Sequence, residues 1–148
     1  MPIPTQSLAI KTVDGLTVYA VLRRRYDLGY WNTFTANFEA LTTANWYSAG
    51  SNNYTKAATK TAQSANITAE YSITMFTGVP AGVYNVEWYS QQGANPAVSD
   101  PLLATTYDLL WNAVQILPLI NNAGNAVMDG TLVNRPVTIT PLTVNVTD

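Results

Sequence analysis

The chain has 148 residues, a net charge of −2 and only 11% charged residues, whereas a soluble domain usually carries about a quarter. Its 47% apolar residues suffice for one globular domain with a substantial core. It contains no Cys and no His, which excludes disulfides, zinc sites built from these residues and nucleophile–histidine pairs. The acidic balance, with a pI near 4.9, argues against general binding to nucleic-acid phosphates.

The N-terminal residues 1–12 are predicted to form an extended arm. Pro2 and Pro4 disfavour a helix there, and Ile3 lies between them. The start of the chain lacks the basic segment and apolar run of a secretory signal. No apolar run approaches the roughly 20 residues that span a bilayer. We therefore expect no membrane segment, and synthesis in the cytoplasm of a host cell.

Residues 13–115 are predicted to form the main domain. Residues 16–23 are apolar on both faces, which is typical of a strand in the middle of a sheet. A further strand begins at Tyr30, and a short hairpin is expected at 35–37. The segment 48–68 is too long for a structureless loop in a compact domain, so we expect a strand near 54–57 within it.

The stretch 68–91 is predicted to organise the core. Tyr71, Ile73 and Met75 alternate with polar residues before a Gly/Pro turn, and Tyr84, Val86 and Trp88 do so after it. Such alternation is typical of strands with one buried face. The Pro and Gly residues at 77–82 reverse the chain. We therefore predict a hairpin that contributes its aromatic face to a core between two sheets.

The C-terminal part offers two interpretations at its start and an extended segment at its end. Ser99-Asp100-Pro101 fits a helix start, but the spacing of residues 105–111 fits a strand, which we favour. Residues 116–148 are predicted to be an extended β segment or arm. Its apolar residues recur at spacing two, between prolines, and are too apolar for a solvated terminus. With Ile3 they form the predicted assembly interface: Val137, Ile139, Leu142, Val144 and Val146.

Short strands separated by Gly, Pro and Asn turns favour an all-β fold, an antiparallel β-sandwich with extended N- and C-terminal arms. The stretch 81–86, Ala-Gly-Val-Tyr-Asn-Val, resembles the tyrosine-corner segment of immunoglobulin-like domains. Val86 stands where antibodies have Cys. We therefore expect an immunoglobulin-like sandwich that is not an antibody domain.

Four stretches in order resemble small β-domains of tailed-phage and prophage structural proteins. They are Gly-Leu-Thr-Val-Tyr-Ala at 15–20, Tyr-Trp-Asn at 30–32, Pro-Ala-Gly-Val-Tyr-Asn-Val at 80–86, and the run from Gln91 to Asp100. The resemblance covers roughly residues 14–112; the segment 48–68 is longer than in the family, and the tail after Trp111 matches none of it. It implies a virion component without catalytic residues.

The candidate sites have simpler interpretations than catalysis. Glu70 and Glu87 could be taken for an acid–base pair, but both fall at polar, outward positions, so we expect exposed carboxylates. The run Arg23-Arg24-Arg25 is expected to be a solvated strand end. Trp31 and Trp46 are the possible exposed aromatics. The acidic residues are too scattered for a calcium loop, so we expect no metal and no cofactor.

The sequence therefore favours a non-enzymatic structural protein of a bacteriophage virion. It would dock on the capsid, as cement or decoration, or on the tail or neck. Its expected partners are other virion proteins and further copies of itself in a homo-oligomer, with no nucleic acid and no membrane. The alternative is a carbohydrate-binding or adhesin module that uses Trp31 and Trp46 for host attachment.

Overall fold

The computed structural model describes residues 6–48, 50, 53–64, 67–117, 119–120 and 126–127. Within these residues the regular structure is antiparallel β, apart from one 3-10 turn, η1 (Thr43–Asn45). The all-β prediction is therefore confirmed. Ile3 and the predicted interface residues from Val137 to Val146 lie outside the described residues.

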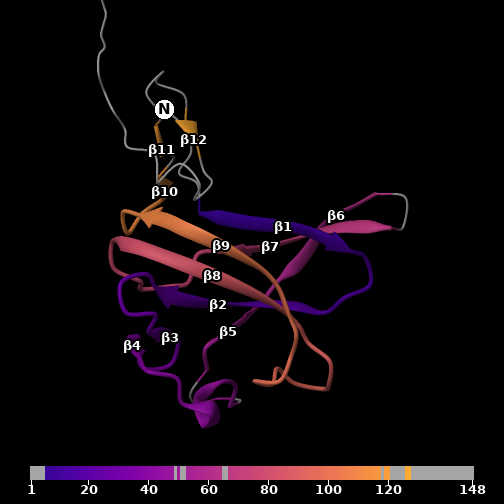
Figure 1. The fold of residues 1–148 in the computed structure, drawn as a ribbon, viewed down its shortest axis with the longest axis horizontal. Helices are drawn as coiled ribbons and strands as arrows, with labels where there is room; N and C mark the ends of the chain where they lie inside the picture. Colours follow the sequence, from indigo (N-terminus) through magenta and orange to yellow (C-terminus); the bar gives the residue numbers. More distant parts are fainter. Residues whose placement is uncertain are drawn as a thin grey trace, which may run out of the picture.

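Two antiparallel sheets make up the body of the molecule (Figure 1). The smaller sheet has the order β1–β7–β6, formed by Ser7–Val13, Thr68–Thr74 and Thr59–Ser64. The larger sheet has the order β10–β9–β8–β2–β3–β4, formed by Ile116–Leu117, Leu102–Trp111, Gly82–Ser90, Val18–Arg24, Tyr30–Asn32 and Asn37–Glu39. β5 (Thr55–Ala57) also pairs with β2, and β11 (Leu119–Ile120) pairs with β12 (Ala126–Val127).

β2 and β8 are the centre of the larger sheet, as the apolar run at 16–23 predicts. β2 pairs with β8 over its whole length, from Val18 opposite Ser90 to Arg24 opposite Tyr84. The first five residues of β2 are all buried. A strand that buries both faces needs a layer on each side, and β2 has both: the smaller sheet on one face, and Trp46 and Tyr54 on the other.

The main core lies between the two sheets. β2 and β8 contribute alternate residues from the larger sheet, with Trp88 fully buried. β7 contributes Ala69, Tyr71 and Ile73 from the smaller one. The alternation in both stretches therefore predicted the buried faces correctly.

The predicted hairpin between these two strands is wrong. β7 pairs with β1 and β6 in the smaller sheet, whereas β8 pairs with β2 and β9 in the larger one. The chain from 75 to 81 crosses from one sheet to the other. Met75, Phe76 and Val79 of this connection are buried in the core, so the connection closes one end of the core instead of forming a surface turn.

The crossing connection is fixed by two aromatic side chains. The indole N–H of Trp111 donates to the Val79 carbonyl at 3.0 Å. The Tyr84 hydroxyl donates to the Pro80 carbonyl at 2.5 Å. Gly78 has a φ of +82°, which favours glycine at this position. These contacts provide hydrogen-bond partners for two carbonyls of a connection that has no neighbouring strand.

Several local predictions are confirmed. β3 and β4 form a hairpin, and the Asn32 side chain accepts a hydrogen bond from the backbone N–H of Phe34 at 2.9 Å in its turn. The predicted strand near 54–57 is β5, and residues 102–111 form a strand as favoured over a helix. The predicted N-terminal arm extends less far than expected, because residues from Ser7 onward form β1 and pair with β7.

Candidate functional site

A second buried cluster covers the outer face of the larger sheet. β2 contributes Tyr19 and Val21, β3 contributes Tyr30, and Trp46 and Tyr54 come from the segment that crosses this face. Tyr19 stacks on Tyr89 at 5.5 Å, and Tyr30 stacks on Tyr54 at 5.1 Å between ring centroids. These aromatic side chains form a second buried core instead of an open platform on which a ligand could stack.

The two tryptophans that we predicted as exposed are both buried. Trp46 is 4% exposed and belongs to this outer cluster, and Trp31 is 2% exposed and belongs to the main core. Trp46 is covered because its edge meets Tyr19 and Tyr89 at steep angles. Trp31 packs against Phe38, with 4.9 Å between the ring centroids. Neither ring is free to stack on a ligand, so this prediction is wrong.

Asp100 is the polar centre of the outer cluster. Its Oδ2 accepts hydrogen bonds from the Tyr19 hydroxyl and from the Ala97 backbone N–H, both at 2.8 Å. Its Oδ1 accepts one from the backbone N–H of Gln92 at 3.1 Å. The Trp46 indole N–H donates in turn to the Tyr19 hydroxyl at 3.2 Å. Burial, together with Asp100, raises the pKa of Tyr19 well above its ordinary value.

A second carboxylate, Glu39, holds the covering segment in place. It accepts hydrogen bonds from the Tyr54 hydroxyl at 2.6 Å and from the side-chain amides of Asn45 at 2.7 Å and Asn32 at 3.2 Å. The hydrogen bond from Tyr54 lowers the pKa of Glu39. Asp100 and Glu39 thus each accept three hydrogen bonds that hold loops and side chains of the outer cluster in place.

Glu70 and Glu87 do not form a pair. Glu70 lies on β7 in the smaller sheet and Glu87 on β8 in the larger one. Glu87 contacts Arg23 at 3.0 Å and accepts a hydrogen bond from the Tyr89 hydroxyl at 2.7 Å. Its side chain is only 15% exposed, so it is less open than we predicted. Neither carboxylate has the arrangement that a glycosidase needs.

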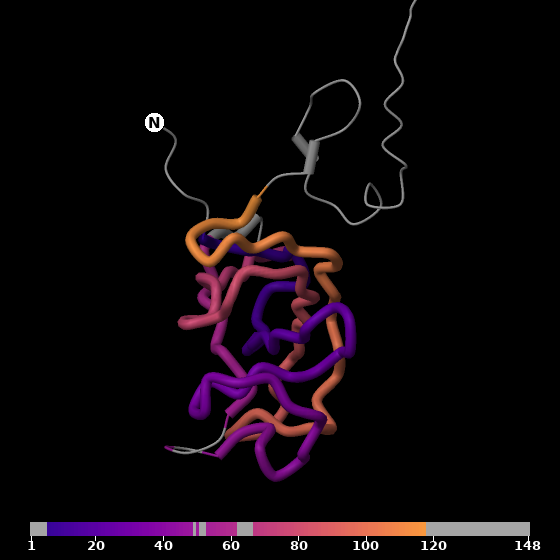
Figure 2. Tube along the Cα trace, turned by 90° about the vertical axis from the view of Figure 1, so that its left-hand side faces the viewer, coloured from indigo at the N-terminus to yellow at the C-terminus, as the bar shows by residue number. Residues whose placement is uncertain are grey.

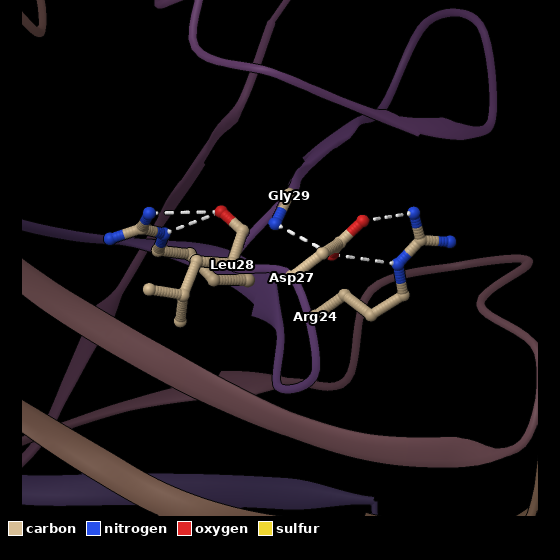
Figure 3. Close-up of polar contacts among 5 residues, drawn as sticks. Arg24, Asp27, Leu28 and Gly29 are labelled. Atoms are coloured by element: carbon tan, nitrogen blue, oxygen red, sulfur yellow. Dashed lines mark hydrogen bonds and ion pairs between the residues drawn. The ribbon is translucent and has the colours of Figure 1, made fainter.

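The three adjacent arginines are more structured than a solvated strand end. Arg23 donates twice to the Leu28 carbonyl, and Arg24 pairs with Asp27 through two hydrogen bonds (Figure 3). Asp27 also accepts a hydrogen bond from the Gly29 N–H (Figure 3). The pairing with Arg24 lowers the pKa of Asp27 to about 2. Arg23 and Arg24 thus stabilise the β2–β3 turn, and the third arginine, Arg25, forms an ion pair with Asp108 of β9.

A small cleft opens where β3, β5 and the crossing connection meet. It has a volume of about 330 Å³ and is lined by Trp31, Thr33, Thr55, Lys56, Phe76 and Thr77. The Lys56 ammonium donates to the Thr74 hydroxyl at 3.1 Å and the Met75 carbonyl at 3.3 Å. Burial lowers the pKa of Lys56. The lining includes no carboxylate, so the cleft offers no acid–base pair.

The remaining feature that could serve a partner is the pair of sheet edges at one side of the sandwich. β1 lies beside β9 and β10, as both Figure 1 and Figure 2 show. The Gln6 side chain donates to the Val114 carbonyl at 3.0 Å near this edge. Among the described residues β1 pairs only with β7, and β9 pairs beyond β8 only with the two residues of β10. Most of the length of both edges therefore lacks a hydrogen-bonded partner strand among the described residues.

The described residues provide neither a candidate metal site nor a membrane-spanning helix. No group of three acidic side chains suited to a metal ion occurs in the described part of the chain. In that same part, no helix is long and apolar enough to cross a membrane. Comparisons with protein-family models, curated proteins and solved structures found no match. Sequence reasoning missed the roles of Tyr19 and Asp100; the available signal was the strand at 16–23, whose two apolar faces require a cover on each side.

Proposed function

We propose that this chain is a non-enzymatic structural protein of a tailed-phage virion, an immunoglobulin-like domain that docks on the capsid or the tail. The observation that carries the proposal is the position of the four stretches behind the phage resemblance: they supply core strands and the loop that is attached to the outer cluster. The resemblance therefore involves the framework of the fold.

The first and fourth stretches meet at Tyr19 and Asp100. Tyr19 belongs to the strand at 15–20, and Asp100 ends the run 91–100. Their hydrogen bond of 2.8 Å is buried and joins residues 81 positions apart. The fourth stretch is therefore a loop that is folded around its own terminal carboxylate and attached to the first strand.

The second and third stretches meet through one intervening ring. Trp31, in the second stretch, packs on Phe38 at 4.9 Å, and Phe38 stacks on Tyr84, in the third stretch, at 5.5 Å. The hydroxyl of Tyr84 returns to the Pro80 carbonyl four residues upstream. A tyrosine that bonds back to the chain in this way is typical of the tyrosine corner of immunoglobulin-like sandwiches, which supports the finer assignment of the fold.

The alternative function as a carbohydrate-binding module loses its basis. It depended on Trp31 and Trp46 being open to a sugar ring, and both are buried. We therefore retain only the structural function.

We further propose that the C-terminal residues 131–148 hold copies of the chain together in a homo-oligomer. Val137, Ile139, Leu142, Val144 and Val146 place apolar side chains at spacing two, as in a strand with one buried face. A strand added to an open sheet edge satisfies its backbone groups and buries such a face at once. The β1 and β9 edges are of the kind that could receive it.

Two measurements test this function. Antibody detection in purified heads and purified tails should find the chain in one of these fractions, and its absence from both would contradict a virion role. Deletion of Thr131–Asp148 should give a folded domain that is monomeric by light scattering and no longer sediments with particles. A truncated protein that still assembled and still bound would contradict the proposed role of the tail.

A further inference from the structure

The backbone groups of β1 alternate between those that bond to β7 and those that point to its free edge. The Met75 N–H donates to the Gln6 carbonyl at 2.6 Å, and the Asp14 N–H donates to the Ile67 carbonyl at 3.1 Å. The register between them is unbroken, with Ser7 opposite Thr74 and Val13 opposite Thr68. In an antiparallel pair, residues alternate between those that bond to the partner strand and those whose backbone groups point away. The even-numbered residues of β1 therefore bond to β7, and the odd-numbered ones point to the open side.

Three successive outward positions result from this alternation. Ser7, Ala9 and Lys11 direct their N–H and C=O groups away from β7, and their side chains are exposed. The next outward residue, Val13, is exposed too, but its carbonyl accepts a hydrogen bond from the Tyr71 hydroxyl of β7 at 3.1 Å. A row of this kind is a template for a further strand. Natural proteins usually protect such an edge by a bulge, by proline, by a charged side chain such as lysine or by making the strand very short. Of these devices β1 has one, the exposed side chain of Lys11.

The other edges carry that protection. β6, the opposite edge of the smaller sheet, has a register irregularity between Lys60 and Ala62. The β8–β9 pairing is irregular at two places, and Asp108 of β9 has a φ of +56°. β4 and β10 are only three and two residues long. Among the described strands, β1 is the regular and open edge.

The apolar surface beside this edge is incompletely covered. Leu8 and Ile10 on β1 and Leu103 on β9 pack against the main core but remain partly exposed. An added strand with an apolar face would extend the smaller sheet and cover this part of the core. It would need apolar residues at spacing two and few charges.

We propose that β1 accepts a strand formed by residues 142–147 of a second copy of this chain. That segment, Leu-Thr-Val-Asn-Val-Thr, has Leu142, Val144 and Val146 at spacing two and no charged residue. Its six residues match the seven of β1 in length. Pro141 precedes it and fixes its start, without removing an N–H from the strand itself. The inference rests on the proposed homo-oligomer and assigns its contact.

Proline substitution at an outward position separates assembly from folding. Ala9→Pro removes an N–H that has no partner in β7, and proline is tolerated on such edges. The variant should remain folded, with an unchanged near-ultraviolet CD spectrum, but should be monomeric by analytical ultracentrifugation. Ala9→Val, at the same exposed position, keeps the N–H and should assemble as the unmodified chain does. An Ala9→Pro protein that still assembled would overturn the proposal.

Amide hydrogen exchange gives a second readout that does not depend on the proline variant folding. The N–H groups of Ala9 and Lys11 should exchange slowly in the assembled full-length protein and at least tenfold faster after deletion of Thr131–Asp148. Equal exchange in both proteins would overturn the choice of β1. If deletion abolished assembly while Ala9→Pro did not, the tail would be the link but β1 would not be its receptor. Slow amide exchange in a full-length chain that is monomeric would place the tail on its own β1. That result would overturn the proposal that the tail binds a second copy.

Discussion

At the scale of single residues, the polar groups in the outer aromatic cluster decide how the molecule is held together. Tyr and Trp rings bury large apolar areas, but their hydroxyl and N–H groups must find partners inside. Asp100 receives three donors and Glu39 receives three. Each carboxylate thereby ties a loop to the larger sheet. The two acids thus have a structural role, Asp100 as a buried group and Glu39 as a half-buried one.

Asp100→Asn tests this role. The amide replaces one accepting oxygen by a donor, so either the Ala97 N–H or the Gln92 N–H loses its acceptor, and the Tyr19 hydroxyl can keep only its weaker contact with the Ala97 carbonyl at 3.2 Å. An unsatisfied buried group costs about 1–3 kcal/mol, so we expect the free energy of unfolding to fall by about 1–3 kcal/mol. Urea denaturation measures it. Ser99→Ala, at the exposed neighbour, should change stability by less than about 0.5 kcal/mol; similar losses in both variants would contradict the role of Asp100.

At the scale of elements, the sequence predicted which faces are buried but not which strands pair. Tyr71, Ile73, Tyr84, Val86 and Trp88 are all buried as their alternation indicates. Alternation specifies a face, and it carries no information about the neighbouring strand. The Gly/Pro residues at 77–82 are compatible with a turn or with a crossing between sheets.

Apolar residues inside the connection were the available sign of a crossing. Met75, Phe76 and Val79 would be exposed in a tight surface turn, whereas in the structure they close the end of the core. The outer cluster was missed for a related reason. Trp46 lies in a segment without periodicity, so only tertiary packing against β2 and β8 reveals that it is buried.

Gly78→Ala tests the geometry of the crossing connection. Gly78 has a φ of +82°, and an added Cβ would meet only the Trp31 ring at an ordinary 4.0 Å. The expected loss of about 1 kcal/mol in unfolding free energy would therefore come from backbone conformation alone. Gly93→Ala is the matched control, because no atom lies within 4 Å of its added Cβ and its φ is not positive. A thermal melt in which both variants matched the unmodified protein would contradict the left-handed conformation at Gly78.

At the scale of the whole molecule, two cores on opposite faces of one sheet should respond together to high pH. Burial raises the pKa of tyrosines in both layers: Tyr19, Tyr30, Tyr54, Tyr84 and Tyr89. Tyr84 lies in the main core and the other four lie in or against the outer cluster. A phenol that stays protonated in the folded state but ionises in the unfolded chain, near pH 10, links unfolding to proton release.

The direction of this linkage predicts alkaline unfolding. The stability contributed by the five buried phenols is complete below pH 10, because both states are then protonated. Above pH 10 the unfolded chain loses protons that the folded chain retains, so the free energy of unfolding falls as the pH rises. Tyrosinate absorbance at 295 nm, followed with far-ultraviolet CD, should show that at least five of the nine tyrosines ionise only as the β signal is lost. Ionisation of all nine with the CD spectrum intact would contradict the burial of the outer cluster, since that layer would then be open to water.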